Sequence, residues 1–255
     1  NPKRPASAKK SKALNFGTAA HDWLLLGRLF LDGFTIIDDE LNLNSKEGKA
    51  AKAEAAESGR ELLRDRDLQA IDAMRKAIEA HPFAGQAFRN GYAEKTLAWK
   101  DRETGVWLRC KPDFLPNALK IIPDYKTTAD ASPEGFQKAI DTFGYFMQAP
   151  LYLDGIEAVF GERPAHWVFV AQEKEPPYLV ELHELTEEAL YRGSRENRTA
   201  IRRFSECLSK DRWPGYSTGI NQIDLPAWTE KRLAARHDAE DAAAFETQTP
   251  KEKAA

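Results

Sequence analysis

Cysteine is scarce in this chain of 255 residues, and so is any surplus of charge of one sign. Cys110 and Cys207 are the only cysteines, which excludes a disulfide framework and a zinc or iron–sulfur cage made of four cysteines from one chain. Lys and Arg number 37 against 40 Asp and Glu, for a formal net charge of −3. This balance excludes a uniformly basic protein that coats nucleic acid, although a local basic groove can exist because the net charge averages over opposite faces.

Long apolar runs are also missing. A membrane span needs about 20 consecutive apolar residues, and the longest candidate, around Trp23 to Phe34, is interrupted by Arg28 and Asp32. The chain starts at Asn1 without a charged and then apolar leader, which indicates a fragment or a processed product without a secretory signal. We therefore expect a protein of a reducing, cytoplasmic compartment with no membrane partner.

The distribution of apolar residues predicts one ordered domain over residues 15–230. Residues 1–14 contain several Lys and Arg and no acid, which indicates a flexible arm that either solubilises the chain or contacts phosphates. Residues 46–60 are mostly Ala, Lys, Glu and Gly and are expected to form an exposed insertion, either a loop or a solvated helix. Residues 231–255 are again Ala-rich and charged, and we expect a frayed tail.

The predicted elements follow the order of an α/β fold. Hydrophobic periodicity predicts helices, three strands, more helices, two strands and a long helix, which together indicate a central mixed β-sheet flanked by helices. The expected strands are 93–100, 105–113, 119–126, 167–171 and 178–182, with a hairpin turn at 101–105. The expected helices are one with His21 near its start, 65–80, 134–146, one from near Pro150 to about Phe160, and 186–208.

The most informative stretch contains Asp113 and, after ten intervening residues, Asp124-Tyr125-Lys126. Alternate residues of a strand point the same way, so Asp124 and Lys126 share a face and Tyr125 points to the other. If the preceding strand pairs antiparallel with this one, Asp113 comes beside them. An Asp-x-Lys triplet alone is common on surfaces, but burying such charges at the end of a core strand would be costly without a purpose.

Two carboxylates and an ammonium group suit a site for Mg²⁺. This cation prefers oxygen ligands, keeps several waters and takes a phosphate oxygen as a further ligand. It would polarise a phosphodiester and lower the pKa of a bound water, which Lys126 could orient or deprotonate. Glu94 and His21 are other groups of suitable type, for a second cation.

These residues resemble the PD-(D/E)xK nucleases of the RecB-like branch, most closely the nuclease domain of the RecE (exodeoxyribonuclease VIII) family of phages and prophages. The resemblance runs from about Gly17 to Trp228. It is carried by five ordered blocks: Gly17-Thr18-Ala19-Ala20-His21, Glu94 before Trp99, Cys110-Lys111-Pro112-Asp113, Pro123-Asp124-Tyr125-Lys126-Thr127-Thr128, and Gln148 with Tyr152.

The resemblance implies a role for each residue of the central set. Asp113 and Asp124 would be the main ligands of Mg²⁺, for which Mn²⁺ can substitute. The main-chain carbonyl of Tyr125 would complete the coordination shell. Lys126 would activate the attacking water.

Four more residues receive implied roles. His21 would approach the metal from the N-terminal helix and Glu94 would support the metal or its waters; the competing interpretations are a helix-start histidine bonded to backbone and an exposed strand carboxylate. Gln148 and Tyr152 match a Gln-x-x-x-Tyr motif that contacts the substrate backbone or steadies the catalytic Lys, with Pro150 standing between them. Some cations near the site in sequence are expected to contact phosphates: Arg109, Lys111, Lys120 and Lys138.

The resemblance also implies 5′-to-3′ digestion of linear duplex DNA from its ends, leaving a 3′ single strand for a single-strand annealing recombinase. It implies a ring-shaped homo-oligomer, with a tetramer favoured over a trimer, in the cytoplasm of a bacterium or of a phage-infected host. One alternative is a Cas4-like or repair nuclease acting on single strands, although the cysteines of the iron–sulfur version are lacking. The more distant alternative is a non-catalytic module that binds DNA ends.

Overall fold

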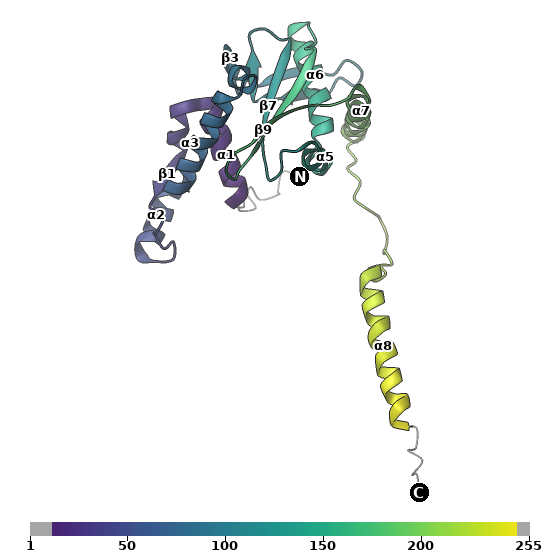
Figure 1. Ribbon diagram of the computed structural model, residues 1–255. Helices are drawn as coiled ribbons and strands as arrows, with labels where there is room; N and C mark the ends of the chain where they lie inside the picture. The colour runs from purple at the N-terminus through teal and green to yellow at the C-terminus, as the bar shows by residue number, and fades with distance from the viewer. Residues whose placement is uncertain (1–11, 249–255) are drawn as a thin grey trace. The chain divides into compact units, whose positions relative to one another are not determined.

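The central sheet of the protein has three strands. The computed structural model describes residues 12–248, and the chain divides into two units, residues 1–206 and 207–255. In the first unit, β7 (Ile121–Thr128) pairs in parallel with β8 (His166–Glu173), and β8 pairs antiparallel with β9 (Val180–Glu184) (Figure 1). The sheet is therefore mixed.

Helices cover both faces of this sheet, because neighbouring side chains of β7 and β8 point into two separate apolar cores. Trp167 and Phe169 face one core with α5 and α6, whereas Tyr125 and Val170 face a second core with α1 and α3 (Figure 1). These helices are α1 (Lys12–Leu26), α3 (Asp65–Ala80), α5 (Pro133–Phe143) and α6 (Tyr145–Phe160). The predicted α/β architecture, a mixed sheet between helices, is confirmed.

A broken hairpin precedes β7. Its strands are β3 (Gly91–Ala93), β4 (Leu97–Lys100), β5 (Trp107–Cys110) and β6 (Phe114–Pro116). The strand β4 pairs antiparallel with β5, and β3 with β6. Between the two pairs, the Glu94 N–H donates to the Asp113 carbonyl at 3.0 Å, and Glu94 adopts a φ of 56°, which is uncommon for a residue other than glycine. The predicted hairpin is present. At its interruption, Glu94 lies between β3 and β4, and Asp113 lies opposite, between β5 and β6.

The other elements lie outside this framework. They are the 3₁₀ helix η1 (Gly27–Gly33), β1 (Phe34–Ile37), α2 (Lys46–Glu57), β2 (Glu61–Arg64), α4 (Ala84–Ala87), α7 (Glu187–Ser209) and α8 (Ala227–Gln248). The strands β1 and β2 pair in parallel, and the sequence did not predict them. The expected insertion at 46–60 contains α2, a mostly exposed helix whose N-cap, Ser45, accepts a hydrogen bond from the Gly48 N–H.

Two predictions about the ends of the chain differ from the structure. The first helix begins at Lys12, so His21 lies in its second half and not near its start. The segment expected as a frayed tail is helical as far as Gln248, in α8. Residues 1–11 of the expected basic arm lie outside the described residues, and residues 12–14 belong to α1. Between residues 12 and 248, no helix has both the length and the apolar character needed to cross a bilayer.

The helix α6 continues through Pro150, where the sequence favoured a helix start. Pro150 has no N–H to donate to the carbonyl of Phe146, four residues earlier. Gly193 of α7 lies so close to this carbonyl that a Cβ on the glycine would be 1.8 Å from the oxygen. Asn197 of α7 donates to the next carbonyl, that of Met147, at 2.8 Å. The freed turn of α6 is thus covered by α7, which explains why the helix tolerates the proline.

Candidate active site

Strand β7 places a carboxylate beside an ammonium group inside the protein. Asp124 and Lys126 lie on one face of β7, and Asp124 is completely buried. One Asp124 oxygen contacts the Lys126 ammonium group, and the other accepts a hydrogen bond from the Gln148 amide at 2.8 Å. Tyr125 points into the opposite core, as the alternation predicted. The cost of burying a carboxylate is therefore met by one cation and one hydrogen-bond donor.

Asp113 reaches this pair from the break in the hairpin. Its Oδ2 accepts a hydrogen bond from the Tyr125 main-chain N–H at 2.8 Å and lies 4.0 Å from the Lys126 ammonium nitrogen. The sequence argument allowed this convergence through antiparallel pairing with β7. Among the described residues, β5 and β6 pair with β4 and β3 instead. The hydrogen bond from the Tyr125 main-chain N–H to the Asp113 side chain therefore holds Asp113 beside β7.

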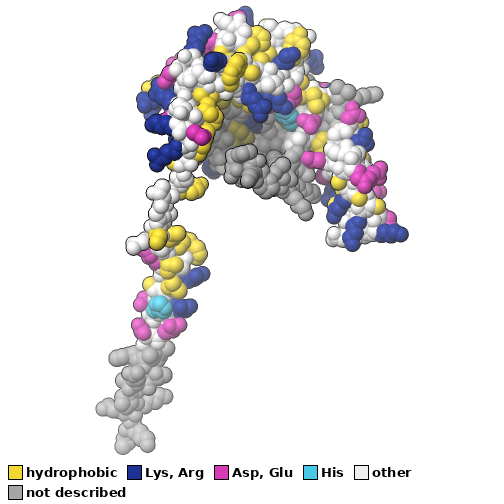
Figure 2. Space-filling model, turned by 180° about the vertical axis from the view of Figure 1, so that it is seen from behind, with side chains coloured by type: hydrophobic (Ala, Val, Ile, Leu, Met, Phe, Trp, Pro, Cys, Tyr) yellow, Lys and Arg dark blue, Asp and Glu magenta, His cyan; other side chains and the backbone are white. Residues whose placement is uncertain are grey.

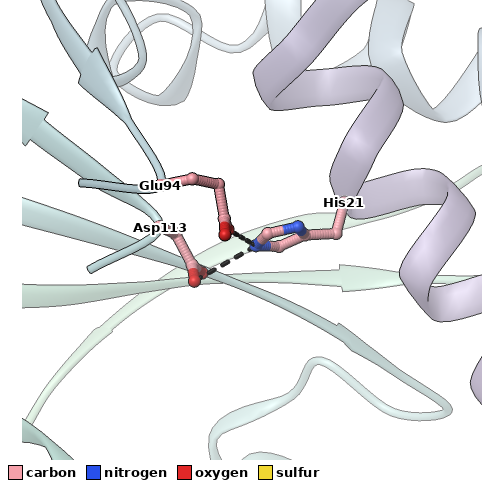
Figure 3. A group of neighbouring side chains, drawn as sticks. All are labelled: His21, Glu94 and Asp113. Carbon is pink, nitrogen blue, oxygen red and sulfur yellow. Dashed lines mark ion pairs between the residues drawn. The ribbon is translucent and has the colours of Figure 1, made fainter. Parts of the chain in front are cut away.

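His21 joins two acidic side chains from the helix α1 (Figure 3). Its Nε2 lies 3.1 Å from Asp113 Oδ1 and 3.5 Å from Glu94 Oε1. Gly17, one helical turn earlier, allows the close approach, because a Cβ there would lie 3.0 Å from Thr127 Oγ1 at the end of β7. Contacts with two carboxylates disagree with the interpretation of His21 as a helix-start histidine bonded to backbone.

The charges of the site shift one another's pKa values. Burial would lower the pKa of His21, but hydrogen bonds to Asp113 and Asp22 raise it to about 9. Burial raises the pKa of Asp124 to about 7 against the opposing effect of Lys126. Burial would also raise the pKa of Asp113, yet His21 and Lys126 hold it below its usual value. Burial would lower the pKa of Lys126, but the two aspartates raise it. The protein's own cations therefore offset the carboxylates.

The geometry of His21, Glu94 and Asp113 fits a divalent cation. One ligand atom from each of the three lies within 4.8 Å of the others. The two carboxylates are oxygen ligands of the kind that Mg²⁺ and Mn²⁺ prefer, and the imidazole nitrogen is a ligand more typical of other transition metals. Asp124 is held next to this group through Lys126. A place for Asp124 and for the Tyr125 carbonyl in the coordination shell stays a prediction.

Helix α6 contributes the third side of the site. The Gln148 amide donates a hydrogen bond to Asp124, so it steadies a carboxylate and not Lys126 directly. Tyr152 is partly buried and packs edge-on against Trp167, with ring centroids 5.4 Å apart. Tyr145 was not predicted as a site residue, yet its ring centroid lies 5.1 Å from the Lys126 ammonium nitrogen. Tyr145 is three residues before Gln148, and this spacing places both on one face of a helix; it was the feature of the sequence that could have indicated Tyr145.

A polar residue of β8 was also missed. Gln172 is completely buried. Its side-chain oxygen accepts a hydrogen bond from the Tyr125 hydroxyl at 2.7 Å, and its amide donates to the Met74 carbonyl at 2.8 Å. Gln172 thus fixes the far side of β7 to helix α3, directly behind the site.

Comparison with known proteins shows the family of the chain. The family described as "PDDEXK-like domain of unknown function" (DUF3799) matches residues 2–226. The chain belongs to this family. The assignment of Asp113, Asp124 and Lys126 to the two acids and the lysine of a PD-(D/E)xK motif stays a prediction.

One solved structure with the same fold comes from Eubacterium rectale and is described as a "putative exonuclease". The two proteins are 12% identical with a TM-score of 0.57, over 86% of this chain and 79% of the other. At this identity the likeness shows the fold alone. No curated protein matches the chain. The PD-(D/E)xK resemblance is confirmed, and the closer likeness to RecE stays a prediction.

Proposed function

We propose that this PDDEXK-like protein is a metal-dependent deoxyribonuclease that hydrolyses phosphodiester bonds beside Lys126. The observation that carries the proposal is the buried pair of Asp124 and Lys126 next to the three potential ligands His21, Glu94 and Asp113. A structural ion pair would not need a histidine and two more carboxylates around it. A hydrolytic site for phosphodiesters would use all of them.

The residues divide into ligands and a residue that acts on water. His21, Glu94 and Asp113, with Asp124 and the Tyr125 carbonyl, would hold Mg²⁺ or Mn²⁺. The cation would polarise the phosphate and lower the pKa of water.

Lys126 would orient the attacking water and offset the negative charge that develops on the phosphate. Its raised pKa favours this role over removal of a proton. Gln148 would hold the Asp124 carboxylate in position through its hydrogen bond. Tyr152 packs in the apolar core beside Trp167, and its predicted contact with the substrate backbone belongs to this proposal.

We further propose that the substrate is the end of linear duplex DNA, digested from 5′ to 3′. The product would be a 3′ single strand, which an annealing recombinase could take up in the cytoplasm of a bacterium or of a phage-infected host. A ring-shaped homo-oligomer, a tetramer before a trimer, would keep the enzyme on its substrate. These finer statements rest on the RecE resemblance of the sequence.

Digestion of a linear duplex, labelled separately at its 5′ and 3′ ends, tests the proposal. The assay contains Mg²⁺ or a chelator, with closed circular DNA and the folded Lys126→Ala variant as controls. We expect metal-dependent loss from 5′ ends, intact circles and an inert variant.

The other outcomes point to the alternatives. Loss from 3′ ends would reject the polarity and keep the nuclease. Faster digestion of single strands would favour the Cas4-like or repair nuclease. A folded protein that cuts no DNA would favour the non-catalytic module that binds DNA ends.

A further inference from the structure

The outer face of the β4–β5 hairpin carries an exposed aromatic side chain in a row with positively charged side chains. Trp107 and Arg109 of β5 point outward, and Trp107 is 71% exposed. Their partners across the ladder are Lys100 and Ala98 of β4, both exposed. The inward side chains Leu97, Trp99 and Cys110 fill the core. The core thus accounts for one face of the hairpin and leaves the other unexplained.

This face leads directly to the candidate active site. Lys111 continues the outward row after Arg109 and contacts the Glu94 carboxylate. Asp113 follows two residues later. At about 3.4 Å per residue of an antiparallel strand, the row from Trp107 to Lys111 extends over about 14 Å. We call the four residues Lys100, Trp107, Arg109 and Lys111 the hairpin track.

Among the described residues, Glu94 pairs with Lys111, and nearby acids leave the other two cations of the track unpaired. The acids of the hairpin turn are held by arginines of α7: Asp101 pairs with Arg198 at 2.7 Å, and Glu103 pairs with Arg202. Among residues 12–248, Lys100 and Arg109 make no ion pair. Figure 2 shows one face of the molecule, on which Lys and Arg lie among acidic and apolar side chains. The track therefore combines unpaired positive charge with an exposed aromatic ring.

We propose that the hairpin track binds an unpaired segment of a DNA strand next to the bond that is cut. Arg109 and Lys111 contact phosphates, since guanidinium and ammonium groups pair with phosphate oxygens. Trp107 stacks on a base, which requires that the base be unpaired. The inference rests on the proposed nuclease function and adds the path by which the substrate strand reaches Glu94 and Asp113.

Binding without cleavage tests the track separately from the nuclease reaction. The probe is a labelled oligothymidylate about 12 nucleotides long, within the range of single-strand sites, mixed with the full chain in chelator. Variants are Trp107→Ala, Trp107→Phe and Arg109→Ala. The matched controls are Phe83→Ala, an aromatic residue 73% exposed at the start of α4, and Lys52→Ala, an exposed cation on α2.

We expect Trp107→Ala to weaken binding about 5- to 100-fold through loss of one stacked base, and Trp107→Phe to restore most of it. Arg109→Ala should weaken binding and flatten its dependence on salt, because one phosphate contact is lost. Both control variants should bind like the parent.

Unchanged binding by Trp107→Ala and Arg109→Ala would overturn the track, and so would an equal loss in the control variants. Absence of binding by the parent would overturn it as well. If the binding pattern appears but no DNA is cut with Mg²⁺, the track stands and the nuclease proposal fails. If the parent cuts DNA and the track variants bind and cut equally well, the track alone fails.

Discussion

Asp124 and Gln172 are both polar, both completely buried, and both on the paired strands β7 and β8, yet their surroundings differ. Gln172 accepts from Tyr125 and donates to Met74, so neutral partners from two other elements satisfy it. Asp124 accepts a hydrogen bond from the Gln148 amide and forms an ion pair with Lys126. Its pKa is raised to about 7, chiefly by burial.

We propose that this difference separates a polar group that holds the fold from one that carries chemistry. Neutral hydrogen bonds stabilise a core at little electrostatic cost, whereas a buried carboxylate is costly, and strongly shifted pKa values are typical of functional sites. Four substitutions test this contrast, in order of decreasing effect on cleavage.

The largest effect is expected from Asp124→Asn. The amide keeps the shape of the side chain but loses the negative charge that a metal ligand beside Lys126 needs. Cleavage should fall by about a thousandfold or more, because the metal site supplies several kcal/mol of stabilisation to the transition state. Single-turnover cleavage with Mg²⁺ measures the loss, and circular dichroism shows whether the variant is folded.

The second-largest effect is expected from His21→Gln, on the pH dependence of metal binding. Its folded pKa of about 9 lies above the ordinary 6.5, so the stability that the charged imidazole adds to the metal-free protein is lost as the pH rises toward 9. A metal must displace the same proton.

Mn²⁺ affinity should therefore rise with pH, by about tenfold per unit below 9 for one released proton. Calorimetric titrations from pH 6.5 to 9 measure this slope. His21→Gln should bind more weakly and with a shallower slope. An identical slope in this variant would exclude His21 as a ligand.

A smaller effect is expected at Tyr145, which holds Lys126 by a contact between cation and ring. Such contacts are worth about 0.5 to 2 kcal/mol, so Tyr145→Leu should lower the cleavage rate by up to about thirtyfold without changing DNA affinity. Tyr145→Phe keeps the ring and should cut like the parent. Equal losses in both variants would assign the effect to the hydroxyl.

The smallest effect on cleavage is expected from Gln172→Leu. The Tyr125 hydroxyl and the Met74 carbonyl would lose their partner, which should lower the free energy of unfolding by about 1 to 3 kcal/mol. Urea unfolding measures this change. Below the melting temperature the cleavage rate should stay that of the parent; a loss as large as that of Asp124→Asn would remove the distinction between the two residues.

The sequence was sufficient where local periodicity decides the structure. The alternation along β7 correctly separated Tyr125 from Asp124 and Lys126, and the turn after Lys100 forms the predicted hairpin. The family resemblance then pointed to His21 and Glu94, which the structure brings to Asp113. No single block of sequence could have shown that contact, because it joins three distant elements.

The sequence was insufficient to predict features that depend on tertiary contacts. The helix α6 runs through Pro150 because Gly193 of α7 lies against the turn that the proline leaves free. Gln172 stands in an apolar strand with no sequence signal for its bonds to Tyr125 and Met74. The strained φ of Glu94 is likewise visible only once the two halves of the hairpin are assembled.

The most direct test compares Asp124→Asn, Gln172→Leu and the parent on one linear duplex, with Mg²⁺ and at a temperature where all three are folded. The account predicts that the parent and Gln172→Leu cut at the same rate, that chelator stops both, and that Asp124→Asn leaves the DNA intact. Cleavage by folded Asp124→Asn at the rate of the parent would contradict it.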